Sequence, residues 1–233
     1  GIIACGWMVG SGDDSDGITS RRATDRPFFK PVSLDPRLAR LAVNVASGPR
    51  DKGATLDLMT GTGGFVLEAA LSGRETYGVD LDPLMIEGAQ QNLDWAMPDS
   101  DAHLLLGDAT RLPHVIPSDA HHRICGFVLD PPYGRNSQGS LDHAELIRSV
   151  LESTRMVAAS SADLVLILPI HPFGELPDEA LEPDASVELL HGKWDDLQST
   201  FTATGWRINN RWVEHVHASL GRLILHATIV PQD

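Results

Sequence analysis

The sequence predicts an α/β protein with a doubly wound sheet that is mostly parallel and carries a C-terminal antiparallel hairpin. Short apolar runs alternate with segments whose apolar residues recur at helical spacing, a pattern typical of parallel strands joined by helices. The length of 233 residues suits one large domain of this class. The last stretch, 206–230, departs from the alternation, because two strand patterns flank a turn at Ser219–Gly221 and indicate a hairpin on one edge of the sheet.

The first 25 residues differ in composition from the rest. The chain opens at Gly1 with the apolar segment GIIACGWMV, and residues 10–20 (GSGDDSDGITS) have the small, acidic composition of a flexible linker. We therefore expect residues 1–25 to be a strand remnant and linker, and residues 26–233 to be the main domain. We also expect an N-terminal part of the natural protein to be missing from this chain.

The main domain opens with a predicted helix over residues 33–48, SLDPRLARLAVNVASG. Its apolar residues have helical spacing, Ser33 or Asp35 is the N-cap, Pro36 lies in the first turn and Gly48 follows the end. The strands that we expect after it cover residues 54–61, 76–82, 102–109, 123–130 and 162–170. The helices that we expect between these strands cover residues 63–73, 83–96 and 141–158.

Charge and cysteine content narrow the functional classes. The formal net charge is −14, with 32 acidic and 18 basic residues, whereas a protein that binds nucleic acid unaided usually has a basic excess. We expect either a solubilising acidic surface or a basic module elsewhere that supplies affinity for a polyanion. Only Cys5 and Cys125 occur, both in apolar runs, which favours a reducing cytoplasm over a disulfide framework. Because no apolar run approaches the ~20 residues of a membrane span, we expect no membrane attachment. We also expect the protein to be a cytoplasmic monomer.

Three further features are less specific. Residues 171–196 hold eight acidic residues against one lysine, so we expect a solvated loop, with a lid beside the active site as the alternative. His215 and His217 share one face of a strand but have no third ligand at a suitable spacing, so no metal site is predicted. The tryptophans that we assign to core or edge packing are Trp194, Trp206 and Trp212.

A glycine turn follows the first strand of the main domain, in the segment LDLMTGTGGF at 56–65. Glycines at 61, 63 and 64 let the backbone approach a ligand closely, and a purely structural tight turn would explain them as well. The dinucleotide pattern G-x-G-x-x-G is not met, because Val66 occupies the position of its last glycine. The turn therefore indicates a ligand loop without identifying the ligand.

Acidic residues at the ends of the next two strands sharpen this prediction. Asp80 ends the second strand, where a carboxylate can accept both ribose hydroxyls. Asp108 ends the third strand, where it can accept a hydrogen bond from an adenine amino group. The order of these features suits an adenosine without a pyrophosphate, which indicates S-adenosylmethionine. Helix N-capping, for which aspartate is common, is the alternative role for both acids.

The fourth strand ends in DPPYGR at 130–135. Two prolines stiffen this segment and remove two backbone donors, so a carboxylate and an aromatic ring are held rigidly at the mouth of the sheet. Asp130 can accept one N–H of a planar amino group, the carbonyl of Pro131 can accept the other, and Tyr133 can stack on the ring. A surface turn with a proline cap is the alternative. The segment predicts methyl transfer to an exocyclic amine, and Pro132 completes the rigid catalytic group.

The chain resembles a known family through these motifs together. The segments RPFFKPVSLDPRLARLAVNVA, LDLMTGTGGFVLEAA, GVDLDPLMIEGAQQNL and FVLDPPYGR are similar to those of the archaeal and eukaryotic tRNA guanine-10 N2-methyltransferase family, over about residues 26–230. The resemblance implies a Rossmann-like methyltransferase sheet, S-adenosylmethionine as cofactor and tRNA as substrate. It also implies that the full-length protein carries an N-terminal THUMP-type RNA-binding region.

The resemblance assigns roles to individual residues. Catalytic roles go to Asp130, Pro131, Pro132 and Tyr133. Cofactor binding goes to Ser33, Asp57, Thr60, Gly61, Gly63, Asp80, Leu81, Asp108 and Ala109. We further expect tRNA to contact Arg26, Lys30 and Arg135.

Two positions depart from the family pattern and leave other functions open. The hairpin reads VHASLGR at 216–222 where the family tends to VHRSLTR, so Ala218 and Gly221 put RNA binding or target choice in doubt. One alternative is an amino-methyltransferase acting on DNA adenine, ribosomal RNA guanine or a protein glutamine. Another is a non-catalytic RNA-binding module, which the intact DPPY segment disfavours.

Overall fold

The computed structural model describes residues 14–31, 33–48, 53–132, 143–172 and 187–231. Their α-helices are α1 (Asp14–Thr19), α2 (Pro36–Ser47), α3 (Gly64–Leu71), α4 (Pro83–Ala96), α5 (His143–Val157) and α6 (Trp194–Ala203). Two 3₁₀ helices are η1 (Ala23–Asp25) and η3 (Ala109–His114). The strands are β1 (Ala54–Asp57), β2 (Thr76–Asp80), β3 (His103–Leu106), β4 (Ile124–Leu129), β5 (Ala158–Ile170), β6 (Trp206–His217) and β7 (Leu220–Ile229).

One seven-stranded sheet organises the described residues, in the order β3-β2-β1-β4-β5-β7-β6. The first five strands in this order are parallel, whereas β7 runs antiparallel to both β5 and β6. The predicted fold class is therefore confirmed, including the C-terminal hairpin at one edge. The turn of that hairpin lies between His217 and Leu220, slightly before the predicted position at Ser219–Gly221.

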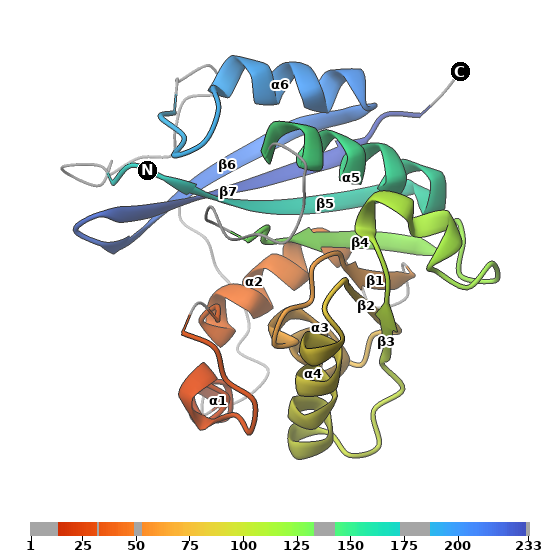
Figure 1. Cartoon of the computed structure of the whole chain (residues 1–233), viewed down its shortest axis with the longest axis vertical. Coiled ribbons are helices and arrows are strands. Elements are labelled where there is room, and N and C mark those ends of the chain that lie inside the picture. The colour runs from red at the N-terminus through yellow and green to blue at the C-terminus, as the bar shows by residue number, and fades with distance from the viewer. Residues whose placement is uncertain (1–13, 32, 49–52, 133–142, 173–186, 232–233) are drawn as a thin grey trace, which may run out of the picture.

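Helices cover both faces of this sheet. Figure 1 shows α2, α3 and α4 on one side, and α5 and α6 on the other. The larger apolar cluster joins α5 and α6 to the sheet through residues such as Leu151, Phe201 and Trp206. A second cluster joins α2 and the start of α3 to the opposite face through Val43 and Phe65. The central parallel strands β1 and β4 are thus buried on both sides, as is typical of this class.

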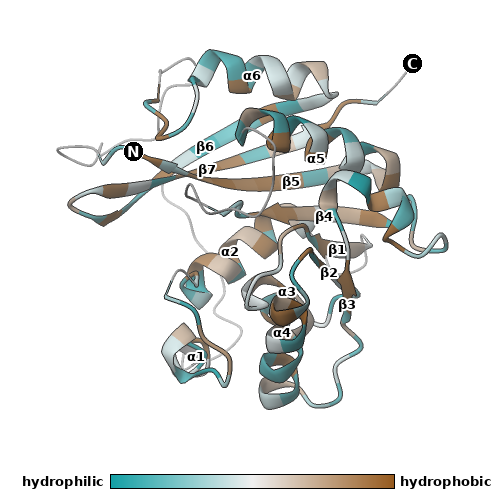
Figure 2. Ribbon diagram, viewed as in Figure 1, coloured by the Kyte–Doolittle hydropathy of each residue, from teal (hydrophilic) through white to brown (hydrophobic). Residues whose placement is uncertain are grey.

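Strand composition follows from this burial. Every residue of β4 is buried, and its sequence ICGFVL is a continuous apolar run, as expected of a central parallel strand. Figure 2 shows the central strands as predominantly hydrophobic, with polar colours on the outer helix surfaces. The outermost strand β3 is short and has two exposed positions, which fits a sheet edge.

Two helices lie where the sequence indicated loops. Helix α1 occupies residues 14–19 of the expected linker. Helix α6 begins at Trp194, inside the acidic stretch expected to be a solvated loop, and its indole and the ring of Phe201 are buried. The acidic residues at the start of α6 occupy its first turn, where negative charge favours the helix dipole.

The β6–β7 hairpin is the longest antiparallel element. Register shifts between Ile208 and Asn210 and between His215 and His217 interrupt its ladder, and such bulges bend and twist a strand. Figure 1 shows the hairpin turn projecting past the other strands. Among the described residues, no helix has the length and apolar character needed to cross a bilayer.

Candidate active site

Acidic residues converge at one edge of the sheet, where the parallel strands end. Asp57 ends β1, Asp80 ends β2, Asp108 follows β3 and Asp130 follows β4. Asp57 lies opposite Val128 in the β1–β4 register, two residues before Asp130. Ligands of open α/β sheets bind at this edge, close to the point where the strand order reverses. Here the reversal lies between β1 and β4, so Asp57 and Asp130 flank it.

The glycine turn has the backbone geometry that its composition suggested. Gly61 and Gly63 have φ values of 51° and 82°, in the left-handed region that glycine adopts without strain. A Cβ at position 63 would lie 2.9 Å from the Cβ of Ala89, so this glycine also permits close packing of α3 on α4. Beside this turn, Thr60 is buried and its backbone N–H donates to the carbonyl of Val79.

Asp80 holds this turn in place. Its Oδ2 accepts a hydrogen bond from the backbone N–H of Gly61 at 2.7 Å, and its Oδ1 accepts from that of Asp82 at 2.9 Å. Asp82, not Asp80, is the N-cap of α4, because its Oδ1 accepts from the N–H of Leu84. The capping alternative therefore does not describe Asp80, whose carboxylate joins two turns at the ligand edge.

Asp108 does cap a helix. Its Oδ1 accepts hydrogen bonds from the backbone N–H of Thr110 at 2.9 Å and from the hydroxyl of that residue at 2.7 Å, at the start of η3. Both bonds use the same oxygen, so capping is compatible with a second bond to Oδ2. The neighbouring Ala109 is buried and packs in the core rather than at the surface.

Asp57 is a buried acid at this edge. Its side chain is buried, with 1% of its surface exposed, and neither carboxylate oxygen has a hydrogen-bond partner among the described residues. Burial raises the pKa of Asp57 well above its usual value, and the negative charges of Asp80 and Asp130 raise it further. The nearby backbone amide of Met59 offsets this only in part. A buried acid without a partner is a feature of ligand sites.

The segment before α2 is fixed against the glycine turn. The hydroxyls of Ser33 and Thr62 lie 3.1 Å apart, and Ser33 also donates to the carbonyl of Lys30. Buried Asn92 on α4 donates to the carbonyl oxygens of both Phe28 and Thr62 at 2.9 Å. Sequence reasoning found Ser33 but missed Thr62 and Asn92, although a buried asparagine within a helix pattern is a signal of a specific polar contact.

Exposed leucines lie beside Asp80. Leu81 is 62% exposed, and Leu106, which pairs in register with Asp80, is 59% exposed. Leu84, in the first turn of α4, is also exposed. The sequence indicated Leu81 but not the other two. Together they offer an apolar surface next to the acid that the sequence assigned to a ribose.

The DPPY segment at 130–133 is described in part. Asp130 is half-buried, Pro131 is buried and Pro132 is exposed, at the end of a fully buried β4. Tyr133 and Arg135 lie outside the described residues. Asp130 therefore lies directly after β4, at the edge where the parallel strands end, as the sequence predicted.

The residues assigned to tRNA contacts occupy different environments. Arg26 is buried, with 5% of its surface exposed, and its Nε donates to the carbonyl of Arg21 at 2.9 Å. Lys30 is half-buried and its Nζ lies 5.6 Å from the ring centre of Phe28. In this position Arg26 does not present its guanidinium to an outer surface, where phosphates of a nucleic acid would approach.

The sequence of this chain matches that of known proteins. A family profile described as "RMKL-like, methyltransferase domain" matches residues 23–175, which include every described acid of the ligand edge. The chain belongs to this family.

Relatives of this methyltransferase domain extend the comparison. The chain is 32% identical, over 87% of its length and 52% of the relative, to a tRNA (guanine(10)-N2)-dimethyltransferase of Pyrococcus abyssi. It is 34% identical, over 64% of its length and 42% of the relative, to a protein of the same name from Methanothermobacter thermautotrophicus. The chain thus spans about half the length of these curated relatives, or less. A magnesium protoporphyrin IX methyltransferase from Synechocystis PCC 6803, solved with bound SAM, shares the fold with a TM-score of 0.57 at 13% identity, covering 96% of this chain and 100% of that one.

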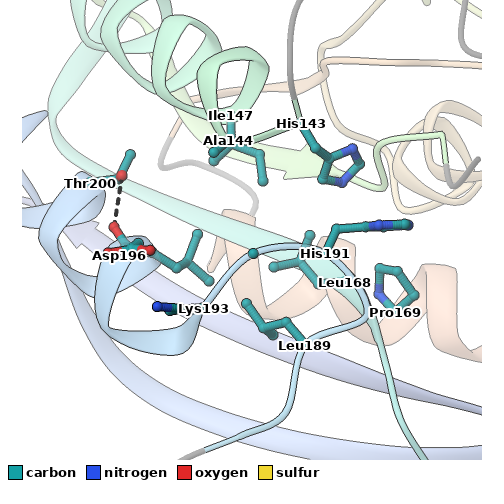
Figure 3. Close-up of a pocket in the computed structure, with 12 residues that line it drawn as sticks. His143, Ala144, Ile147, Leu168, Pro169, Leu189, His191, Lys193, Asp196 and Thr200 are labelled. Atoms are coloured by element: carbon teal, nitrogen blue, oxygen red, sulfur yellow. Dashed lines mark hydrogen bonds between the residues drawn. The ribbon is translucent and has the colours of Figure 1, made fainter. Parts of the chain in front are cut away.

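A further hollow of the methyltransferase domain lies between α5, α6 and the end of β5 (Figure 3). The rings of His143 and His191 face each other across it, with centres 5.2 Å apart. Leu168 and Leu189 form apolar walls, and Lys193 adds a positive charge. Leu168 and Pro169 lie close to the end of β5, so this hollow lies near the edge where the parallel strands end.

Proposed function

We propose that this chain is the catalytic domain of an S-adenosylmethionine-dependent tRNA methyltransferase that modifies the exocyclic N2 amino group of a guanosine, at position 10. The observation that carries the proposal is the placement of Asp130, Pro131 and Pro132 at the strand-order reversal, directly beside the glycine turn of β1. Membership of the methyltransferase family and the printed names of the curated relatives support it.

The described residues of the ligand edge fit S-adenosylmethionine. Asp57 is a buried acid without a partner and suits a cationic amino group, while Asp80 retains acceptor capacity for ribose hydroxyls. Leu81 and Leu106 provide an apolar surface for a flat ring, with Asp108 beside it as an acceptor for the adenine amino group. When bound, this cofactor supplies an electrophilic methyl group.

Asp130 and Pro131 act on the nucleophile. An exocyclic amine is a weak nucleophile because its lone pair is delocalised into the ring. Two acceptors, the carboxylate of Asp130 and the carbonyl of Pro131, favour the tetrahedral geometry that frees this lone pair, and Asp130 can take up the departing proton. Because Pro131 and Pro132 have no N–H and a fixed φ, the two acceptors keep their orientation without reorganisation.

The tRNA affinity of the whole protein comes, in this proposal, from a part outside this chain. The net charge of −14 opposes binding of a polyanion, and the chain spans about half the length of its curated relatives, or less. We assign that affinity to an N-terminal THUMP-type region, with the domain acting as a monomer in the cytoplasm. Arg135 and Lys30 are the residues of this chain that we assign to contacts near the target nucleotide.

Nucleoside analysis of tRNA tests the function. A full-length version of the protein is incubated with unmodified tRNA and cofactor carrying an isotopically labelled methyl group, alongside its Asp130→Ala variant. We expect labelled N2-methylguanosine with the parent protein, none with the variant, and loss of the label when the guanosine at position 10 is replaced by adenosine. Label on adenosine, cytidine or protein instead would contradict the proposed target.

A further inference from the structure

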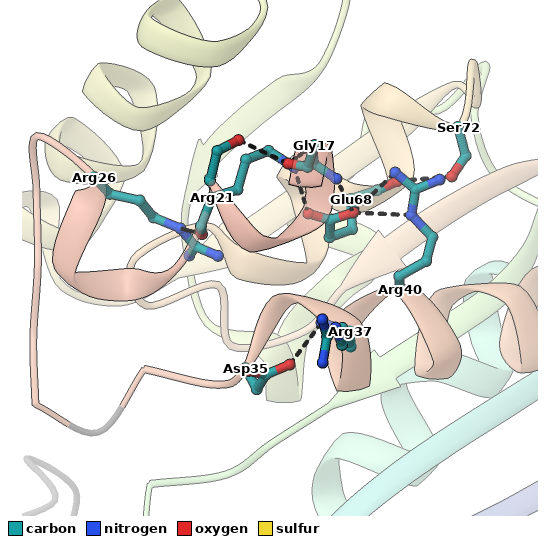
Figure 4. A network of polar contacts seen from close by, with 9 residues as sticks. Gly17, Arg21, Arg26, Asp35, Arg37, Arg40, Glu68 and Ser72 are labelled. Carbon is teal, nitrogen blue, oxygen red and sulfur yellow. Dashed lines mark hydrogen bonds and ion pairs between the residues drawn. The ribbon is translucent and has the colours of Figure 1, made fainter. Parts of the chain in front are cut away.

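A buried cluster of charges lies between α2, α3 and the segment that follows α1 (Figure 4). It contains Arg21, Arg26, Arg40 and Glu68. The side chain of Glu68 is fully buried, and Arg26 is the most deeply buried of the three arginines. Ionised groups in such positions require partners, because desolvation is costly.

Two of the arginines form ion pairs with Glu68. Arg21 donates from Nε to Oε1 at 2.9 Å and from Nη2 to Oε2 at 3.1 Å. Arg40 donates from Nε to Oε2 at 2.8 Å, with its Nη2 also 2.8 Å from that oxygen. The carboxylate is therefore shared by two guanidinium groups, and none of these bonds goes to Arg26.

Arg26 forms no ion pair with any residue that the structure describes. Its Nη1 and Nη2 are buried and have no hydrogen-bond partner among the described residues. Burial lowers the pKa of Arg26, although the charge of Glu68 counteracts this. The charge of Asp35 also raises the pKa of Arg26, but Asp35 is exposed. If Asp35 is counted as a member, the cluster holds three arginines and two acidic residues. One anion is missing from the cluster.

The free side of Arg26 lies at the start of α3. A Cβ built on Gly64, the first residue of this helix, would lie 3.4 Å from Arg26 Nη1. The N-cap is Gly63, which has no side chain to accept from the first backbone N–H groups of the helix. A helix N-terminus carries partial positive charge and free donors, so it attracts the same ligand as the guanidinium beside it.

We propose that Arg26 binds the carboxylate of the amino-acid end of the cofactor, which makes it a cofactor-binding and specificity-determining residue rather than an RNA contact. The inference rests on the proposed function. Asp57 supports it from the other side of the glycine turn, because it is a buried acid without a partner. A buried guanidinium and a buried carboxyl group, each without a partner among the described residues and at the two ends of one glycine turn, match the carboxylate and the ammonium group of an amino acid.

Burial favours this ligand over a phosphate of tRNA. The guanidinium nitrogens of Arg26 have no exposed surface, and the segment that carries it is fastened by Asn92 and by the Ser33–Thr62 contact. A small carboxylate inside the ligand edge can reach such a group, whereas a nucleic-acid backbone lies on the outside of a protein. Binding of a cofactor carboxylate and binding of a tRNA phosphate predict different results for the same substitution of Arg26.

Calorimetry with two cofactor analogues tests the proposal in this chain. S-adenosylmethionine and decarboxylated S-adenosylmethionine differ only in the carboxylate. For Arg26→Gln we expect S-adenosylmethionine to bind about 10- to 100-fold more weakly, as for the loss of a charge-assisted hydrogen bond, and the decarboxylated analogue to bind as it does to the parent chain. Arg22→Gln, which removes an exposed arginine of the same segment, should change neither affinity.

Each remaining outcome counts against the proposal. Equal weakening of both ligands by Arg26→Gln would assign it a structural role, and unchanged binding of both would remove it from the site. Unchanged cofactor binding with weaker tRNA binding would return it to RNA contact. If Arg26→Gln does not fold, Arg26→Lys retains the charge without the fork and should weaken only the carboxylate ligand. Failure of the folded parent chain to bind either compound is a separate result, because it would overturn the cofactor assignment itself.

Discussion

The side chain of Asn92 is bonded to both backbone groups of Phe28, 64 residues earlier in the chain. Its Oδ1 accepts from the Phe28 N–H and its Nδ2 donates to the Phe28 carbonyl, both at 2.9 Å. The same Nδ2 donates to the carbonyl of Thr62 in the glycine turn. One fully buried side chain on α4 thus joins the segment before α2 to the ligand turn.

Replacement of Asn92 should therefore loosen two parts of the site together. Asn92→Ala leaves buried donors and acceptors of Phe28 and Thr62 without partners, and we expect a loss of about 2–4 kcal/mol in the free energy of unfolding, measured by urea denaturation. Gln91→Ala, at the exposed neighbouring position, is the matched control and should change stability by less than about 0.5 kcal/mol. Equal stability of the two variants would show that water replaces the Asn92 bonds without cost.

Gly88 tests the packing of the same segment. A Cβ at this position would lie 2.1 Å from Cδ1 of Phe28, so Gly88→Ala should destabilise the protein by about 1–3 kcal/mol despite the better helix propensity of alanine. In a Phe28→Ala background the clash is absent, and the same change should stabilise by about 0.5–1 kcal/mol. Thermal unfolding of the four proteins gives the coupling energy, and additive effects would contradict the contact.

The buried Asp57 should make stability depend on pH. Because burial raises its pKa in the folded state, the folded protein binds this proton more tightly than the unfolded chain does. The resulting stability is complete below the unfolded pKa of about 3.9 and is lost as pH rises through the raised folded pKa. Asp57→Asn, which needs no proton, should be more stable than the parent chain at pH 8 without ligand, and this difference should shrink toward pH 4. Parallel melting curves for both proteins between pH 4 and 8 would exclude a titrating Asp57.

Asp130 should affect the reaction and not the cofactor. Asp130→Ala removes the acceptor of the target amine, so single-turnover methyl transfer at saturating cofactor should be abolished while cofactor affinity, set by other strand ends, stays nearly unchanged. Asp130→Asn keeps an acceptor oxygen and should retain partial activity. Wild-type rates for Asp130→Ala would remove this carboxylate from the mechanism.

Tyr133 supplies a second, independent test of the target position. Tyr133→Phe keeps the ring and should have a mild effect, whereas Tyr133→Ala should weaken productive binding of the target base by about 1–3 kcal/mol, the value of stacking on one base. The rates are compared under the same single-turnover conditions. Equal rates for the alanine and phenylalanine variants would contradict stacking.

Local sequence signals predicted most of the fold. The helix Pro83–Ala96 matches its predicted range because Asp82 caps it and Pro83 fixes its first turn. Helix α6 was missed because the acidic composition around it indicated a loop, yet the signal was present: Trp194, Leu197 and Phe201 are apolar, buried and at helical spacing. The acidic composition of residues 171–196 led to a loop prediction, although the short amphipathic pattern of the helix begins at Trp194.

The site was predictable only where topology alone positions a residue. Asp80, Asp108 and Asp130 were expected at one edge because parallel strands end together, whereas Asp57 was assigned through the family resemblance. The burial of Arg26 and the bonds of Asn92 depend on contacts between segments far apart in the chain, such as Phe28 and Asn92 at a separation of 64 residues, which leave no periodic pattern in the sequence. Arginine close to a basic cluster indicates a surface by composition, and only packing against α3 shows otherwise.

The position of β7 sets the order in which the sheet can be completed. β5 is buried along most of its length, and its native partner on this side is β7, although β6 precedes β7 in the chain. During synthesis β6 emerges first and can pair with the open side of β5 in the wrong arrangement. The complete sheet requires residues up to Ile229, so one side of the apolar β5 has no native strand partner until β7 has been made, and unpaired apolar strand edges favour aggregation.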